Sequence, residues 1–215
     1  TFIMTQTITN RFDSEGFEAL LASQSEPDWL TTLRRESFEH ASAMEWPQRR
    51  HEEWIRTDIR LFQLSKFGMP LLERPADAAE AASGHHQLLD GVELGGRIET
   101  FDSCITQESL DEDLAAKGVV FGSLSRIAQS HPELVRPYLF TAFDPDHDKF
   151  AALHAAFMNG GQFLYVPRNV VVDRPLHIGS LLSDGGTDTT HTLIVIEEGA
   201  EATVLHESNS TARAG

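Results

Sequence analysis

Cysteine, positive charge and long apolar runs are all scarce in this chain of 215 residues. The single cysteine, Cys104, excludes an intrachain disulfide, which fits a reducing compartment. The chain has 17 Lys plus Arg against 33 Asp plus Glu, a formal net charge of −16, and this disfavours a broad surface for nucleic acid or anionic membrane. No apolar run is long enough to cross a bilayer and no secretion signal is visible, so we expect a cytoplasmic protein without membrane contact.

The common catalytic signatures are also missing. None of the three lysines, Lys66, Lys117 and Lys149, stands in the glycine-rich context of a phosphate-binding loop. The chain has no Gly-x-Ser-x-Gly elbow, no His-Glu-x-x-His and no Gly-x-Gly-x-x-Gly before a helix. We therefore predict no catalytic residue and a protein that is not an enzyme.

Two segments near the C-terminal end share a pattern of short apolar strand, tight corner and second short strand. Residues 164–176 align with residues 194–205 at an offset of 30 positions, with Val166 on Ile196. At the corner Asn169 aligns with Gly199, and these residue types most readily adopt left-handed backbone. Such a repeat favours a solenoid whose coils stack on each other. A hairpin sandwich stays possible, because the pattern does not decide whether neighbouring strands are parallel.

The rest of the chain predicts helices and a linker. Ser25 is the expected N-cap of a helix that ends before Pro47, and Asp144 opens a second helix that ends at the glycines 160–161. Residues 75–84 are alanine-rich and end at glycine, as in a linker. We divide the chain into an N-terminal helical domain, 1–84, in which 1–3 look like a cloning remnant before the natural start, a mixed α/β connecting region, 85–146, and an incomplete β core, 147–215.

Ten histidines invite a metal-site hypothesis, which the sequence supports weakly. His85 and His86 are adjacent and point in different directions, which favours a surface role. His147 and His154 are two helical turns apart, too far for both to reach one ion. Cys104, without a cysteine partner, is best interpreted as a small buried apolar residue.

The strand region offers the sharpest metal hypothesis. His177, His191 and His206 would project from successive coils into one row if the register allowed it, although half-buried strand histidines are ordinary. The sequence does not fix that register, so the metal and cofactor ligands stay unassigned.

Three stretches together resemble the SufB/SufD family of iron–sulfur cluster assembly proteins. Residues 26–34 with 49–58 are similar to the family's N-terminal helical signature, 149–161 to its central helix, and 163–176 to its first β coil. The similarity runs from about residue 26 to 207. The Arg-Arg-His-Glu-Glu-Trp phrase at 49–54 and the single cysteine favour the SufD side of the family over SufB.

The resemblance implies a right-handed parallel β-helix, truncated here, preceded by an α-helical N-terminal domain. It implies a non-catalytic scaffold subunit whose partners are a SufB-like paralogue and SufC, an ABC-type ATPase. The family's cluster-related residues lie in later coils, so none is assigned here; the iron–sulfur cluster and flavin belong to the full complex, and we expect this part to bind neither. The open end of the β-helix predicts self-association or partner binding.

Two enzyme alternatives remain. A β-helix carbohydrate lyase or hydrolase would use groove carboxylates, for which Asp173, Asp184 and Asp188 are the candidates. A hexapeptide-repeat acyltransferase is disfavoured, because its six-residue aliphatic period is absent.

Overall fold

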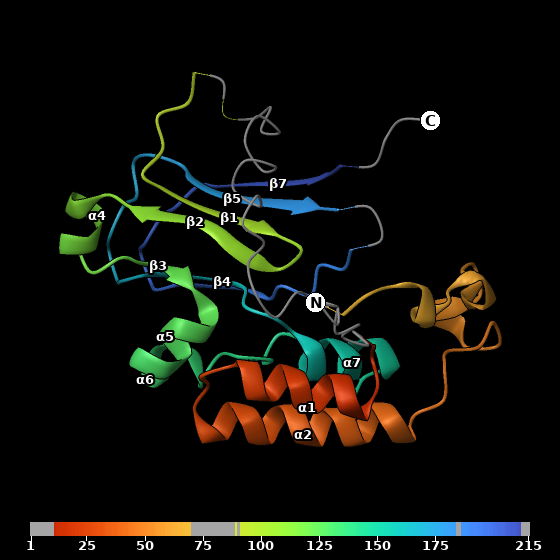
Figure 1. Ribbon diagram of the computed structural model, residues 1–215. Coiled ribbons are helices and arrows are strands. Elements are labelled where there is room, and N and C mark those ends of the chain that lie inside the picture. The colour runs from red at the N-terminus through yellow and green to blue at the C-terminus, as the bar shows by residue number, and fades with distance from the viewer. Residues whose placement is uncertain (1–10, 70–88, 90, 184–185, 212–215) are drawn as a thin grey trace, which may run out of the picture.

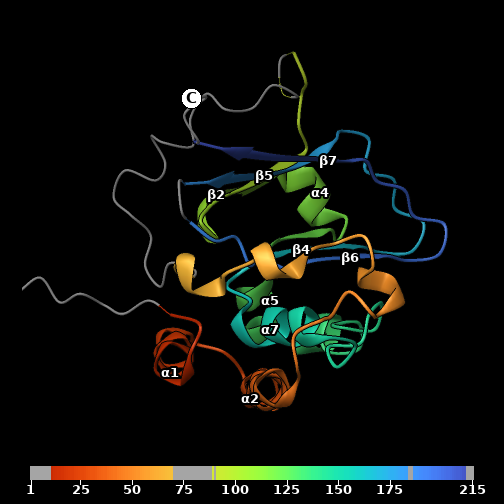
Figure 2. The same cartoon turned by 90° about the vertical axis from the view of Figure 1, so that its right-hand side faces the viewer.

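The computed structural model describes residues 11–69, 89, 91–183 and 186–211. Figure 1 shows two β-sheets stacked above a layer of helices, and Figure 2 shows the same layers from the side. The helical layer contains α1 (Ser14–Ser23), α2 (Asp28–Ala43) and α7 (Lys149–Phe157). The expected N-terminal boundary at 84/85 and the alanine-rich linker lie outside the described residues, and the division into three regions stays a prediction.

Helices α1 and α2 form an apolar layer against α7. The Asp13 carboxylate caps α1 by accepting a hydrogen bond from the Gly16 amide at 3.0 Å. Helix α2 buries Leu30, Arg34, Ser37 and Ala41 at steps of four, three and four residues, which is one face of a helix. The expected cap at Ser25 is wrong: α2 begins at Asp28 and Pro27 occupies the N-cap position without a side-chain bond.

Residues after α2 form a separate segment of short turns. It contains the 3₁₀ helices η1 (Glu52–Trp54), η2 (Ile59–Leu61) and η3 (Leu64–Lys66), at the right of Figure 1. Trp54 attaches η1 to α7 by stacking on Phe150, with ring centroids 5.2 Å apart.

The middle of the chain has short helices around the sheets: α4 (Glu112–Ala116), α5 (Leu124–Ser130) and α6 (Pro132–Val135). Ser123 caps α5, because its hydroxyl accepts a hydrogen bond from the Arg126 amide. The predicted helix start at Asp144 is wrong. Helix α7 begins at Lys149, where the Asp148 carboxylate accepts from the Ala151 amide at 2.8 Å.

The strands form two sheets. The first has the order β2 (Cys104–Leu110), β1 (Gly96–Phe101), β5 (Leu176–Leu182) and β7 (Val204–Ser210). The second has the order β3 (Val120–Ser123), β4 (Gln162–Val166) and β6 (Thr192–Ile196). Strand β5 pairs with β1 and β7 in parallel, and β4 with β6 in parallel, whereas β1–β2 and β3–β4 are antiparallel.

The predicted fold class, a right-handed parallel β-helix, is wrong for this structure. Both sheets are mixed, and the described residues show no solenoid or closed sheet. The physical reason is that strands outside the repeat, β2 and β3, pair antiparallel with neighbours. A hairpin turn with Asp102 and Ser103 at positive φ joins β1 directly to β2. Because the two strands are adjacent in sequence, their antiparallel pairing forms easily.

The offset of 30 residues is nevertheless the true register of the first strand and the corner of the repeated segments. Val166 pairs with Ile196 on β4 and β6 at this offset, whereas Leu176 pairs with Val204 on β5 and β7 at an offset of 28. Asn169 and Gly199 both have left-handed backbone, with φ of 60° and 73°. The alignment of the first strand and the corner is therefore confirmed, whereas the second strand is displaced by two residues and the solenoid class is wrong.

The core has three parts, one between the sheets and two against the helices. Leu164 and Val166 of β4 face Leu176 and Ile178 of β5 between the sheets. On the other face of β4, Phe163 packs with residues of α2, α5 and α6. The third part joins the aromatic rings of α1 and α7. In the described part of the chain no helix is both long and apolar enough to span a membrane.

Candidate functional site

Two histidines meet where α7 ends and β6 begins. The Nε2 atom of His154 lies 3.0 Å from Nδ1 of His191, and both side chains are partly buried. This distance is a hydrogen bond in which one neutral imidazole donates and the other accepts. Figure 2 shows α7 next to the sheet that contains β4 and β6, and His191 directly precedes β6 in sequence.

The backbone around His191 is fixed by a close approach of two chain segments. Gly161 has φ of 114°, and a Cβ atom there would lie 2.2 Å from the His191 carbonyl oxygen. The amide of Gln162 donates to that same oxygen at 2.9 Å. Glycine is required here because both the backbone angle and the contact exclude a side chain. The backbone position of His191 is therefore fixed.

The position of His154 depends on Arg34 of α2, which holds the end of α7 in place. The Arg34 side chain is fully buried and makes a bidentate ion pair with Glu26, at 2.6 Å for each of the two bonds. Its Nη1 donates to the carbonyl oxygens of Ala156 at 3.0 Å and Met158 at 2.5 Å. Carbonyl groups at the C-terminal end of a helix such as α7 lack a hydrogen-bond donor within the helix. The helix dipole also favours a positive charge at this end. Arg34 thus fixes the last turn of the helix that carries His154.

Burial keeps both imidazoles neutral. Desolvation lowers the pKa of His154, and the positive charge of Arg34 lowers it further, partly offset by Asp188. Desolvation lowers the pKa of His191 to about 4, with His154 as the second cause. Neutral imidazoles have free lone pairs at pH 7, which is the form that binds metals.

Aromatic rings enclose the histidine pair. The Phe140 ring lies 4.9 Å from the His191 ring, and the Phe143 ring lies 6.0 Å from it, centroid to centroid. Phe140 has φ of 58°, a left-handed conformation that is costly for a bulky residue. Strain of this kind persists where surrounding structure imposes it and often marks a functional position.

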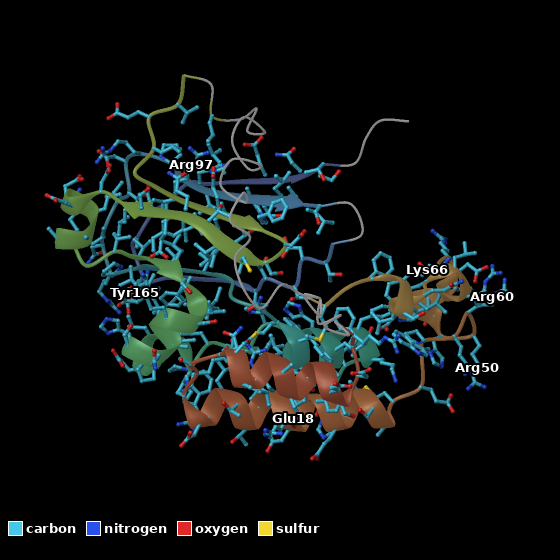
Figure 3. All side chains as sticks on the ribbon, in the orientation of Figure 1. Glu18, Arg50, Arg60, Lys66, Arg97 and Tyr165 are labelled. Carbon is cyan, nitrogen blue, oxygen red and sulfur yellow. The ribbon has the colours of Figure 1, made fainter. Side chains whose placement is uncertain are left out.

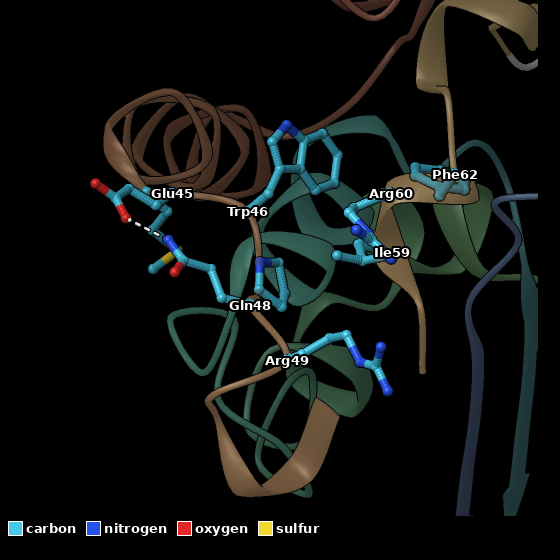
Figure 4. Close-up of a pocket in the computed structure, with 9 residues that line it drawn as sticks. Glu45, Trp46, Gln48, Arg49, Ile59, Arg60 and Phe62 are labelled. Atoms are coloured by element: carbon cyan, nitrogen blue, oxygen red, sulfur yellow. Dashed lines mark hydrogen bonds between the residues drawn. The ribbon is translucent and has the colours of Figure 1, made fainter. Parts of the chain in front are cut away.

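A second feature is an open apolar pocket of about 840 Å³ between the end of α2 and η2. Figure 4 shows Trp46, Ile59, Arg60 and Phe62 close together in its lining, with Arg49 below them. The lining contains one carboxylate, from Glu45, and no histidine, serine or cysteine. The pocket is suited to hold an apolar group beside an anion, but it lacks a nucleophile.

The positive charges around this pocket contrast with the acidic rest of the chain. Arg50, Arg60 and Lys66 project outward from the segment of short turns, while Glu18 projects from α1 (Figure 3). Arg60 pairs with Asp58 at 2.7 Å, so part of this charge is already neutralised.

The predicted row of strand histidines is wrong. His177 on β5 is fully buried and lies 3.3 Å from the Glu207 carboxylate of β7. His206 on β7 is in register with Ile178, one residue along, so its side chain lies on the opposite face of that sheet from His177. His191 lies directly before β6 of the other sheet. The three do not converge.

The other sequence candidates do not form a site in the described residues. His147 lies 3.5 Å from Glu53 and apart from His154, as its spacing predicted, and Cys104 is half-buried. His85 and His86 lie outside the described residues. No group of three or more His, Cys, Asp or Glu that suits a metal ion occurs in the described part of the chain.

The carboxylates of the lyase alternative are also separated. Asp173 is exposed and precedes β5, whereas Asp188 accepts from Ser180 near the other end of that strand at 2.8 Å. Asp188 also accepts from the Thr190 amide at 2.9 Å, and Asp184 lies outside the described residues. Asp173 and Asp188 therefore do not make the pair of carboxylates that glycoside cleavage requires.

Sequence reasoning missed the pair of His154 and His191, although one signal was present. The 30-residue offset places His191 beside Gly161, which closes the helix that carries His154. Combining the repeat register with the helix end would have brought the two residues together.

A family model described as the SufBD protein N-terminal region matches residues 12–178. This match covers more than half of the chain, so the chain belongs to that family. The family predicted from the three sequence stretches is thereby confirmed.

Individual relatives agree with this assignment. The chain is 30% identical over 209 residues to the iron–sulfur cluster assembly protein SufD of Bacillus subtilis, covering 93% of the chain and 46% of the relative. It is 27% identical to SufB of the same organism, covering 92% and 43%. A SufBD family protein of Synechocystis is 27% identical, covering 95% and 45%. The chain thus spans less than half the length of these relatives.

Proposed function

We propose that this chain is part of a non-catalytic scaffold subunit in iron–sulfur cluster assembly, acting with a SufB-like paralogue and a SufC-like ATPase in the cytoplasm. The observation that carries the proposal is the family match over residues 12–178. The relatives named above are themselves called cluster assembly proteins. The absence of a catalytic signature in the sequence agrees with a scaffold.

The structure supports a docking role through one apolar end of the sheet pair. Ile194 and Ile196 of β6 are in register with Leu164 and Val166, so they point into the space between the sheets. They are nevertheless 45% and 41% exposed. Apolar side chains that belong to an interior layer and stay exposed mark a surface suited to be covered by another protein. We propose that a family partner covers this end.

The cluster is cargo of the assembly system in this proposal. Cluster irons are held mainly by cysteine thiolates, and the chain has only Cys104, so its residues do not fit a complete cluster site. We assign cluster ligands, and the flavin implied by the family resemblance, to the full complex.

A chimera tests the proposal directly. Residues 12–211, which include Ile194 and Ile196, would replace the matching part of Bacillus subtilis SufD in a strain that lacks its own copy. We expect the chimera to co-purify with SufB and SufC and to restore the activity of cluster-dependent enzymes. A matched chimera with Arg34→Met tests whether the fold of this part is needed.

Two outcomes separate folding from function. A soluble, folded chimera that binds neither protein would overturn the proposed role. If the chimera is insoluble, the natural gene product is co-expressed instead with the SufB-like and SufC-like proteins of its own genome. Failure of both proteins to co-purify with it would equally overturn the proposed role.

A further inference from the structure

The segment of short turns after α2, residues 46–67, differs in charge from the rest of the chain. It contains five basic and three acidic residues, a net charge of +2, so the remaining residues total −18. Arg49, Arg50 and Arg56 are exposed and have no ion-pair partner among the described residues. Arg50, Arg60 and Lys66 project outward from the segment (Figure 3). Anionic groups of another molecule are therefore attracted to this segment and repelled elsewhere.

The same segment has a large share of the exposed apolar surface. Eleven large apolar side chains are exposed in the described part of the chain, and five of them lie here: Trp46, Ile55, Leu61, Phe62 and Phe67. Exposed apolar side chains that gather in one place mark a binding surface, whereas isolated ones are ordinary. Trp46 and Phe62 also line the pocket of about 840 Å³, so the pocket is part of this apolar surface.

The aromatic wall of the pocket is held by α7 before any ligand arrives. The Phe150 ring of α7 contacts the rings of Trp46 and Phe62, with centroids 5.3 Å apart in both pairs. The Lys149 Nζ atom donates to the Met44 carbonyl oxygen at 2.7 Å and lies 5.1 Å from the centroid of the Trp46 ring. A pocket that needs little reordering binds its ligand at a smaller entropic cost.

We propose that this pocket binds an acidic peptide segment of a partner protein. One aromatic or aliphatic side chain of the peptide occupies the pocket, and flanking carboxylates pair with the surrounding arginines. A guanidinium group binds a carboxylate through two parallel hydrogen bonds, which fixes its direction as well as its distance. Tryptophan and arginine around one apolar anchor are also the residue types that supply most of the binding energy in protein interfaces.

The charges at the pocket can accept a further carboxylate. Arg60 pairs with Asp58 at 2.7 Å and is the main cause that lowers the pKa of Asp58 to about 2, with Arg49 as a smaller cause. Two guanidinium groups thus share the single charge of Asp58. The Glu45 carboxylate accepts a hydrogen bond from Gln48 at 3.2 Å, and Figure 4 shows it directed away from both arginines.

Size and charge favour a polypeptide over other anionic ligands. Arg50, Arg56 and Lys66 are not part of the pocket lining, so a ligand that pairs with them must extend beyond the pocket. Nucleic acid and anionic membranes present dense negative charge over a wide area, which the net charge of −16 opposes. A short acidic segment meets mainly the local positive charge, because charges beyond about 8 Å are screened at physiological salt.

Fluorescence anisotropy tests the proposal with a fluorescein-labelled peptide that has one phenylalanine between two runs of glutamate. We expect saturable binding of one peptide per chain, and roughly tenfold weaker binding when alanine replaces the phenylalanine. Lysine in place of the glutamates should abolish binding, because the arginines then repel the peptide. No saturable binding of the first peptide, or equal binding of the phenylalanine and alanine peptides, would overturn the proposal.

Substitutions in the protein locate the binding site. Arg49→Glu should weaken binding of the peptide roughly tenfold, since a rim cation becomes an anion. Arg168→Glu is the matched control, because Arg168 is an exposed arginine between β4 and β5, outside the segment of short turns. Equal effects of the two substitutions would show that only net charge attracts the peptide and would overturn the proposal.

The same variants identify other occupants of the pocket. Binding to phosphatidylglycerol vesicles that Arg49→Glu abolishes would assign the pocket to a membrane surface, and self-association that Arg49→Glu abolishes would assign it to a second copy of the chain. Either result would overturn the proposal. The inference does not depend on the proposed scaffold role, because the chimera described above can assemble without binding this peptide and the peptide can bind without assembly.

A second measurement needs no substitution. The indole ¹H–¹⁵N signals of the unchanged protein report its three tryptophans, of which Trp46 lines the pocket and Trp29 belongs to α2. The acidic peptide should move the Trp46 signal first and leave the Trp29 signal in place. A shift of Trp29 without a shift of Trp46 would place the peptide elsewhere and overturn the proposal.

Discussion

At the scale of single residues, Arg34 shows how burial changes the meaning of an ion pair. Arg34 and Arg35 are neighbours on α2, and each makes a bidentate pair with a glutamate. The side chains of Arg34 and Glu26 are 0% and 2% exposed, whereas those of Arg35 and Glu18 are 49% and 58% exposed. Water screens the second pair but not the first, so only the first should matter for stability.

We expect Arg34→Met to lower the free energy of unfolding by about 3 kcal/mol, because it leaves Glu26 charged, buried and unpaired, together with two unsatisfied carbonyl groups. Urea unfolding followed by circular dichroism measures this change. Arg35→Met is the matched control and should change stability little. Equal effects of the two substitutions would show that burial of the pair is not the cause.

His40 provides a pH-dependent contact between α2 and the loop before α7. Its Nδ1 atom pairs with Asp146, which raises the pKa of His40, and Glu36 and Glu39 raise it further. The pair stabilises the fold below the ordinary histidine pKa of 6.5, and that contribution is lost as the pH rises through the higher folded pKa.

A histidine titration by NMR should therefore place the midpoint of His40 above 6.5. Asp146→Asn removes the largest cause and should bring the midpoint back towards the ordinary value. A midpoint that does not respond to this substitution would contradict the pairing.

At the scale of elements, the two corners of the repeat are stacked but not equivalent. Asn169 and Gly199 both have positive φ, and the Asn169 side chain fills the space beside Gly199. A Cβ atom on Gly199 would lie 2.4 Å from the Asn169 amide oxygen. The glycine is therefore required by both backbone and contact, whereas the asparagine is required by neither.

We expect Gly199→Ala to cost about 1–2 kcal/mol of unfolding free energy, the usual penalty for a left-handed residue with a side chain. Asn169→Gly should cost much less, since glycine adopts the same backbone freely. Chemical denaturation of both variants and of the double variant completes a cycle. The double variant should be more stable than the sum of the single changes predicts, because the contact is gone; strict additivity would refute the contact.

These elements also show how far the sequence could predict the structure. The spacing of Val166 and Ile196 gave the true strand register, because stacked segments repeat their apolar residues at one interval. Strand β2 was missed, since residues 104–110 mix Cys, Thr, Gln, Glu and Ser without strict alternation. Without β2, the antiparallel β1–β2 pair that makes the first sheet mixed was not foreseen.

The candidate site was less predictable than the fold, for a physical reason. His154 and His191 are 37 positions apart and meet only through tertiary packing between α7 and the start of β6. The positive φ of Phe140, a further mark of this region, has no signal in residue type. Pairwise geometry of this kind is created by the fold and not by local sequence.

At the scale of the whole molecule, two opposite effects act on the association of two copies: burial of the apolar end favours it, and the large net charge opposes it. The chain carries a formal charge of −16, which makes copies repel each other at low salt. Ile194 and Ile196 offer apolar area at the end of the sheet pair, where burial would be favourable. Charge repulsion is screened by salt, whereas apolar burial is not weakened by it.

We therefore expect concentration-dependent self-association that strengthens as NaCl rises, because salt screens the repulsion and leaves the apolar contact in place. Analytical ultracentrifugation across a wide concentration range measures it. Ile194→Lys with Ile196→Lys should abolish association, since paired surfaces would then bury unpaired charges. Ile55→Lys, at a side chain that is 57% exposed in the segment of short turns, is the matched control and should not. A strictly monomeric chain at every salt concentration would show that this end is not an interface between copies.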